Sequence, residues 1–213
     1  MKNRTLFERE NRNSQKRIYD PEGVYFITAV TKNRFPFFEN EIFCELFVEN
    51  LRICKQLKSF ELYAWVIMHD HIHLLIKPGT KYNYSKVMQF LKRNISRNIN
   101  FIMNENPHDE LSTREGANDH SRLRLPGQKD LLNKFIDKKM VLKSQFLQKP
   151  KHETIAVPRF EWQKSFHDHL IRDEKDLEHH FEYIMQNPID AEYPKNWPYI
   201  FTSPRFKLLS DTL

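Results

Sequence analysis

Cysteine and long apolar runs are both scarce in this chain. Its two cysteines, Cys44 and Cys54, fall inside one helical pattern. That placement excludes a disulfide scaffold or a cysteine zinc site as the organising feature of the fold. No stretch approaches 18 consecutive apolar residues, so we expect no membrane span. The first residues, MKNRTLFERENRNSQKR, lack the apolar core of a signal peptide, and we therefore expect a cytoplasmic protein.

The remaining composition is typical of a well-packed globular chain. Apolar residues make up 39% and aromatic residues 13% of the 213 positions, against 29% charged residues. The mean hydropathy is −0.71, and no internal repeat is present. This length predicts one main domain that carries an elaboration.

The positive charge is concentrated in three segments. Lys and Arg outnumber Glu by six to two in residues 1–18, and residues 81–103 carry five Lys or Arg and no acidic residue. Residues 131–151 carry six against one. Because the net charge of the whole chain is only +6, the remainder is net acidic. A separate basic face is typical of a polyanion-binding protein, but ordinary solvated helix faces produce the same pattern.

Hydrophobic periodicity predicts alternating strands and helices in the first half of the chain. A β-branched and aromatic run after Pro21 and Gly23 indicates a strand. Apolar residues at three-four spacing indicate helices. The expected elements are a strand at residues 24–31, a helix at 41–58, strands at 62–68 and 71–77, and a helix at about 83–103.

The segment from about residue 104 to 158 has the composition of an insertion. Residues 104–130 are polar and rich in turn-forming residues, which predicts a mobile loop. Residues 131–149 regain helical spacing. The insertion is therefore expected to be partly helical.

The last third of the chain predicts one strand and one helix. Residues 159–171 read as a strand, and Asp173 with Asp176 three residues later forms a variant of the capping box. The helix is expected to end near Asn187 because Pro188 follows. A strand, helix, strand, strand, helix, strand order is typical of the split, ferredoxin-like arrangement. We therefore predict an α+β fold, with a ferredoxin-like antiparallel sheet and helices on one face, in a single domain over residues 1–213.

Two histidines on the fourth predicted element form the first candidate site. In His71-Ile72-His73, alternation along a strand sends both imidazoles to one face and Ile72 into the core. Two imidazoles side by side make half of a metal site. His167 and His169 share the same spacing, so the residues alone leave them as a second candidate pair.

The last predicted helix carries the second candidate site. Leu177, Phe181 and Ile184 define its buried stripe. Tyr183 and Asn187 lie four residues apart on the flank of that stripe. A tyrosine there also suits a boundary position, with its ring over the core and its hydroxyl in water.

The two sites together resemble one family. His71-Ile72-His73, the downstream Tyr183-Ile-Met-Gln-Asn187-Pro188 and the preceding Trp162-Gln163 are similar to the HUH single-tyrosine transposases, in particular the REP-associated tyrosine transposases. The likeness covers most of residues 24–103 and 159–190, in the order of the family. It is carried by YFITAVTKNRFPFF, AWVIMHDHIHLLI, LKRNISRNIN, WQKSFHDHLIRD and EYIMQNPI.

The resemblance implies a specific chemistry. A divalent cation, Mg²⁺ or Mn²⁺, is expected at His71, His73 and Asn187. Tyr183 is expected to attack the scissile phosphorus of single-stranded DNA, often beside a hairpin, giving a covalent 5′-phosphotyrosine that permits rejoining. Family members commonly act as homodimers, so a homodimer is expected. Lys92, Arg93 and Arg97, together with the basic arm at residues 1–18, are expected to follow the DNA backbone, although ordinary solubilising charge is the alternative for these cations.

Two other functions suit the same residues. An antiparallel sheet with aromatic side chains and basic helices also suits a non-catalytic nucleic-acid-binding module, which would form no covalent adduct. A metal-dependent hydrolase would use the histidines with water as the nucleophile. In that case Tyr183→Phe would retain most of the activity.

Overall fold

The strands form one antiparallel sheet in the computed structural model, with the order β4-β1-β3-β2-β5. The structure describes residues 18–104, 128–148 and 157–204. The elements are β1 (Tyr25–Val30), two short 3-10 helices (Lys32–Arg34 and Phe37–Glu39), α1 (Glu41–Lys58), β2 (Glu61–Ile67), β3 (His71–Lys77), α2 (Tyr84–Met103), α4 (Gln128–Gln148), β4 (His167–Leu170), α5 (Glu174–Asp190) and β5 (Ile200–Thr202).

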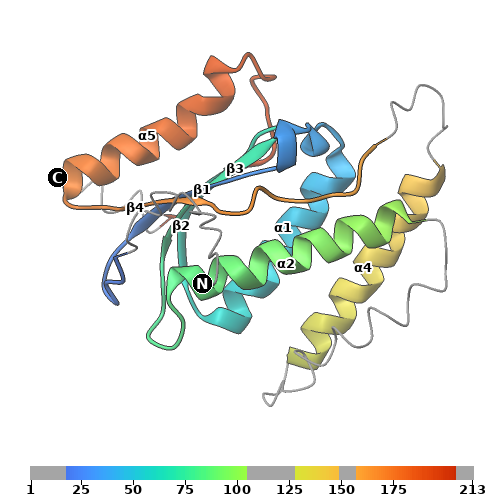
Figure 1. The fold of residues 1–213 in the computed structure, drawn as a ribbon, viewed down its shortest axis with the longest axis horizontal. Helices are drawn as coiled ribbons and strands as arrows, with labels where there is room; N and C mark the ends of the chain where they lie inside the picture. Colours follow the sequence, from blue (N-terminus) through green and yellow to red (C-terminus); the bar gives the residue numbers. More distant parts are fainter. Residues whose placement is uncertain (1–17, 105–127, 149–156, 205–213) are drawn as a thin grey trace, which may run out of the picture.

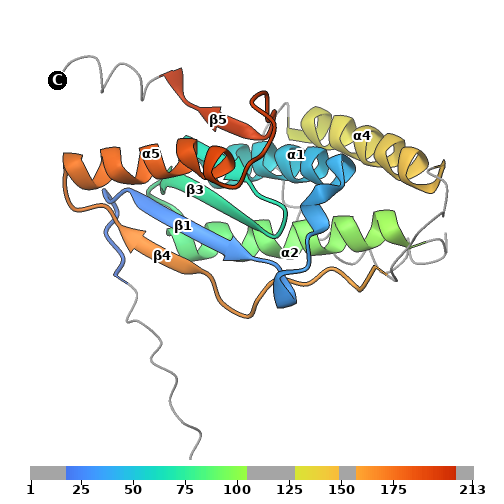
Figure 2. The same ribbon diagram turned by 90° about the horizontal axis from the view of Figure 1, so that it is seen from above.

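The predicted ferredoxin-like α+β fold is confirmed. Strands β4, β1, β3 and β2 lie in the order of the split arrangement, and β5 extends the sheet beyond β2. Helices α1 and α2 cover one face of the sheet, as expected. Helix α5 lies along the opposite face (Figures 1 and 2). The sheet therefore has an apolar cluster on each side.

The main core lies between the sheet and the α1–α2 layer. Ile27, Ile72 and Leu74 contribute from the strands, and their side chains are buried. The second cluster lies under α5, where Ile184 packs against Val66 and Leu75 of the sheet. Both clusters follow from the alternation of side chains along the strands, which sends neighbouring residues to opposite faces.

Local capping explains why α1 has the predicted bounds. The Asn40 side chain accepts a hydrogen bond from the backbone N–H of Ile42 at 3.1 Å, which satisfies a free donor at the helix start. The helix ends at Ser59, whose φ of 51° is left-handed and whose N–H donates to the carbonyl of Lys55. A left-handed residue directly after the last helical residue is a common way for a helix to end.

The predicted helix of the insertion is present as α4. Its buried Phe135 and Leu142 belong to the main core, and the Lys138 ammonium pairs with Glu45 of α1 at 2.7 Å. Most of the predicted mobile loop, residues 105–127, lies outside the described residues. In the part of the chain that the structure describes, no helix combines the length and the hydropathy needed to cross a bilayer.

The strand predicted over residues 159–171 is wrong in its length. Only His167–Leu170 forms β4, and Trp162 makes a single bridge to Thr31. The carbonyls of Gln163 and Ser165 accept hydrogen bonds from the Lys92 ammonium at 2.9 and 3.0 Å. This side-chain contact takes the place of a regular ladder between Trp162 and His167.

The last helix runs past its predicted end. Helix α5 continues to Asp190 and contains Pro188. Proline removes the hydrogen bond that its own N–H would have donated, and its ring crowds the carbonyl four residues earlier, but Pro188 stands only two residues before the helix end. The Pro188 carbonyl in turn accepts from the N–H of Tyr193 at 2.8 Å, so a proline in this last turn is tolerated. The short β5 was not predicted.

Candidate active site

Two histidines of β3 lie on the face of the sheet that α5 covers. Their ring centroids are 4.8 Å apart, while Ile72 between them is buried in the main core. His73 is only 3% exposed, and His71 is half-buried. The strand alternation predicted from the sequence therefore holds at this motif.

Hydrogen bonds orient both imidazoles in the same way. The hydroxyl of Thr28, on the neighbouring β1, lies 2.8 Å from His73 Nδ1. A carboxylate oxygen of Asp70 lies 2.5 Å from His71 Nδ1, and the Arg34 guanidinium donates to the other Asp70 oxygen at 2.9 Å. With Nδ1 engaged in each ring, Nε2 is the nitrogen left to act as a ligand. Such partners fix the tautomer of metal-binding histidines.

Burial keeps His73 neutral. It lowers the pKa of His73 to about 3, with His71 acting in the same direction and Asp70 partly opposing both. Burial by itself would raise the pKa of Asp70, but its hydrogen bonds with His71 and Arg34 outweigh burial and lower that pKa. The site thus combines a neutral imidazole with an ionised carboxylate at neutral pH.

Helix α5 brings Tyr183 and Asn187 to these histidines. The Tyr183 ring centroid lies 5.2 Å from that of His73 in an edge-on arrangement, and Asn187 Nδ2 lies 3.4 Å from His73 Nε2. Tyr183 is nonetheless 46% exposed, so its hydroxyl can be approached from solvent. His71, His73, Tyr183 and Asn187, predicted from separate motifs, therefore lie together.

Contacts at both ends hold α5 in this position. At its start, the Asp173 carboxylate accepts from the backbone N–H of Asp176 at 2.9 Å, as the predicted cap requires. Beyond its end, the Trp197 indole donates to the carbonyl of Ile67 at 2.9 Å, and the Tyr193 hydroxyl accepts from the N–H of His69 at 2.7 Å. The segment that follows the helix is therefore tied to the end of β2 and to the turn before β3.

Comparison with known proteins supports the resemblance. The family described as "Transposase IS200 like" matches residues 22–116. A Haemophilus influenzae protein named "Putative REP-associated tyrosine transposase" is 27% identical over 188 residues, which span 86% of this chain and 82% of that protein. Residues 22–116 are thus similar to the IS200-like transposases, and the similarity to the named relative extends over most of the chain.

The fold of the chain also has a solved counterpart. A REP-associated tyrosine transposase bound to a REP hairpin aligns with a TM-score of 0.54 and 18% identity, over 87% of this chain and 79% of that one. At this identity the match concerns the fold. It agrees with the five-stranded antiparallel sheet described above.

The basic residues predicted to bind DNA lie on another part of the molecule. Lys92, Arg93 and Arg97 belong to α2, which covers the face of the sheet opposite α5 (Figure 1). Lys92 is engaged by the carbonyls of Gln163 and Ser165. Arg93 and Arg97 are exposed. The structure therefore does not bring these three side chains together with Tyr183.

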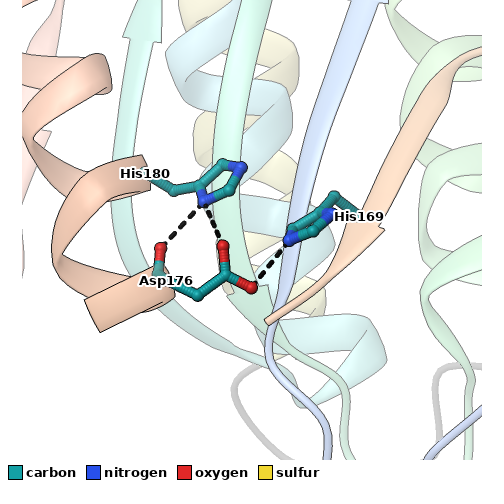
Figure 3. Close-up of side chains that lie close together, drawn as sticks. All are labelled: His169, Asp176 and His180. Atoms are coloured by element: carbon teal, nitrogen blue, oxygen red, sulfur yellow. Dashed lines mark hydrogen bonds and ion pairs between the residues drawn. The ribbon is translucent and has the colours of Figure 1, made fainter. Parts of the chain in front are cut away.

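The alternative histidine pair is divided between two environments. His167 is exposed, whereas His169 Nε2 lies 2.8 Å from a carboxylate oxygen of Asp176. Asp176 also meets His180, whose Nδ1 lies 3.1 Å from its other oxygen (Figure 3). The spacing of Asp176 and His180, four residues apart on one helix, was the signal for this group in the sequence.

The carboxylate of this second group is ionised. Burial by itself would raise the pKa of Asp176, but hydrogen bonds from His169 and from the backbone N–H of Arg172 outweigh it and lower that pKa.

Asp168, which lies between His167 and His169 in the sequence, accepts a hydrogen bond from the Tyr84 hydroxyl at 2.7 Å. His167 and His169 therefore do not act as a pair.

Proposed function

We propose that this protein is a transposase that cleaves and rejoins single-stranded DNA through a covalent 5′-phosphotyrosine on Tyr183. A divalent cation, Mg²⁺ or Mn²⁺, would be held by His71, His73 and Asn187. One observation carries the proposal: the nucleophile and the amide on α5 both contact the buried His73 of β3. These are the groups that the family chemistry requires in one place.

The residues present suit a divalent cation. His73 is neutral and keeps Nε2 toward Asn187, while its Nδ1 is occupied by Thr28. A half-turn of the Asn187 amide would present its oxygen in place of Nδ2, because the two atoms are interchangeable in such a contact. When bound, a cation of this kind neutralises charge on the non-bridging phosphate oxygens and on the leaving oxygen.

Tyr183 supplies the nucleophile. Its phenol oxygen forms a bond to phosphorus, and the bond from phosphorus to the 3′ oxygen breaks, with the electron pair leaving on that oxygen. The phenol proton is lost during the attack. The 3′ oxygen gains a proton, and the products are a 5′-phosphotyrosine and a free 3′-hydroxyl. The reverse attack by a 3′-hydroxyl rejoins the strand and needs no external energy source.

We further propose a single-stranded substrate with a hairpin. The fold match to a REP-associated tyrosine transposase bound to a REP hairpin supports this choice, as do the basic segments of the chain. We also propose a single domain over residues 1–213, with an insertion at about 104–158 that contains α4. The contact of Phe146 of α4 with Phe43 of α1 supports a single domain, because it packs the insertion onto the main core. We also propose a homodimer, to be measured by light scattering.

The decisive experiment traps the covalent intermediate. Hairpin DNA labelled at its 3′ end, and so on the fragment that becomes joined to the tyrosine, is incubated with Mg²⁺ or Mn²⁺ and then denatured. We expect label on the wild-type protein, none on Tyr183→Phe, and none when the metal is chelated. Tyr19→Phe is the matched control, because Tyr19 is also exposed, at 51%, but lies outside the site. It should form the adduct at the wild-type level.

The two alternative functions predict different results. A hydrolase that activates water would cut the strand equally well in Tyr183→Phe and would never retain label. A non-catalytic binding module would retard the hairpin in a gel without cutting it in any variant. Either outcome with a hairpin that the protein binds tightly would overturn the proposed tyrosine chemistry.

A further inference from the structure

A second group of metal-binding side chains lies beside the proposed cleavage site. His169 of β4 and Asp176 and His180 of α5 each offer one ligand atom, and these atoms all lie within 4.8 Å of one another. The two imidazole rings are stacked, with centroids 4.5 Å apart. Figure 3 shows the strand histidine facing the helix, with one oxygen of the Asp176 carboxylate toward each ring.

Phe26 separates this group from the first pair of histidines. Its ring centroid lies 5.2 Å from His73 on one side and 4.7 Å from His180 on the other. The register of β1 places Phe26 opposite His169 and also opposite Leu75. The second group is therefore a separate set of ligands on the same face of the sheet.

The ligand set suits a transition metal ion. Two imidazoles and one carboxylate, with further positions open to water, are typical of zinc and related divalent cations. The spacing of Asp176 and His180 puts two ligands on one helical face, one turn apart, and His169 supplies the third from a different element. The lowered pKa of Asp176 keeps the carboxylate ionised, as coordination requires.

The groups already bound to Asp176 do not block coordination. The Arg172 side chain lies 3.5 Å from one carboxylate oxygen but is 75% exposed, so it can move into solvent when a cation arrives. His180 Nδ1 is also 2.8 Å from the backbone carbonyl of Asp176. Coordination through Nδ1 would replace that contact.

We propose that His169, Asp176 and His180 bind a second divalent cation of the zinc type, distinct from the one at His71, His73 and Asn187. This cation would fasten the first half of α5 to the edge strand β4. His180 lies three residues before Tyr183 on the same helix, so the second cation would fix the position of the nucleophile. The site rests on its own three ligands and not on the proposed cleavage chemistry.

Metal titration of the untagged full-length protein tests this second site. Co²⁺ is added to metal-free protein, and bound equivalents are followed by calorimetry and by visible absorption. We expect His180→Gln and His169→Gln each to bind one equivalent fewer than the wild type. His179→Gln is the matched control, because His179 is the neighbouring histidine of α5 but is exposed; it should bind as many equivalents as the wild type.

Two results would overturn the proposal. One is equal Co²⁺ stoichiometry in the wild type, His180→Gln and His169→Gln. The other is equal loss in His179→Gln and His180→Gln, which would indicate surface binding. Circular dichroism establishes whether each variant is folded. Because His180 and His169 lie on different elements, the test still holds if one of the two variants does not fold.

A His71→Gln variant separates the two sites. It should keep the second equivalent, and Zn²⁺ should still raise its melting temperature by mass action. Zn²⁺ should raise the melting temperature of His180→Gln less than it raises that of His71→Gln. The covalent adduct at Tyr183 is scored independently, so an absent adduct with intact second-site binding would count against the cleavage proposal alone.

Discussion

His73 is the residue on which the site converges. Its imidazole contacts Tyr183 and Asn187 on one side and is held by Thr28 on the other. A buried histidine that stays neutral is ready to bind a cation without first losing a proton, since only the neutral ring coordinates. Burial of this side chain therefore has a cost in folding stability at acid pH.

The pKa of His73 predicts a specific pH dependence of stability. Its folded-state pKa of about 3 is below the ordinary value of about 6.5. Between these values the unfolded chain binds more protons, so stability falls as the pH drops. From pH 7 to pH 5, this group should cost about 2 kcal/mol of unfolding free energy. The measurement is urea unfolding in the presence of a chelator.

The comparison variant is His73→Asn. This variant lacks the titrating ring. Between pH 7 and pH 5 its unfolding free energy should therefore fall by about 2 kcal/mol less than that of the wild type. His167→Asn serves as the control, because His167 is exposed and should keep the wild-type slope. Identical slopes for the wild type and His73→Asn would contradict the predicted burial of a neutral ring.

At the scale of elements, α5 is the part that completes the site. It lies alone on its face of the sheet among the described elements (Figure 2). Its attachment depends on Ile184, which is fully buried over Val66 and Leu75. Ile184 is next to Tyr183 in sequence, so the same turn of helix both anchors α5 and presents the proposed nucleophile.

Truncation of this anchor should weaken both stability and reactivity. Ile184→Ala should lower the free energy of unfolding by about 2–5 kcal/mol, because it removes buried methyl groups and leaves a cavity. It should also slow adduct formation, because Tyr183 is no longer held against His73. Urea unfolding and the trapping assay measure the two effects.

Ile189→Ala is the control on the same helix. Ile189 is 64% exposed, so its truncation should change stability by no more than about 0.5 kcal/mol. If both variants behaved alike, Ile184 would not be the anchor of α5.

At the scale of the whole molecule, the proposed chemistry and the α2 cations lie on opposite faces of the sheet. Tyr183 belongs to α5, and the exposed Arg93 and Arg97 belong to α2, which covers the opposite face of the sheet (Figure 1). A short single strand that fills the site cannot contact both faces at once. Only a longer DNA that passes around the sheet could do so.

This separation predicts that the effect of the arginines depends on DNA length. Arg93→Ala/Arg97→Ala should weaken binding of a long hairpin substrate. The slope of log affinity against log salt should become shallower by about 0.7–0.9 for each phosphate that the variant no longer neutralises. Adduct formation with a short oligonucleotide that spans only the cleavage site should be unchanged. Fluorescence anisotropy across a salt series measures the first effect.

Arg52→Ala is the matched control for charge. Arg52 is an exposed arginine of α1 with Glu49 3.6 Å away, so its charge is already locally compensated. It should leave the salt slope unchanged. Equal effects of the double variant on the long and the short substrates would contradict the separation of the two faces.

Much of the fold was predictable because its signals are local. The bounds of α1 and β3 follow from periodicity and from flanking caps and turns. The placement of His71 and His73 on one face follows from strand alternation, and the shared flank of Tyr183 and Asn187 follows from helical spacing. Each of these depends on residues a few positions apart, whose geometry the backbone sets.

What the tertiary structure decided involves residues far apart in the chain. The contact between His73 and Asn187 joins positions 114 residues apart, and the side of the sheet on which α5 lies determines whether they meet. The shortened β4, the helix that continues through Pro188 and the group at His169, Asp176 and His180 likewise depend on packing. Periodicity determines which face of an element is apolar, but only packing of the whole chain determines which partner covers that face.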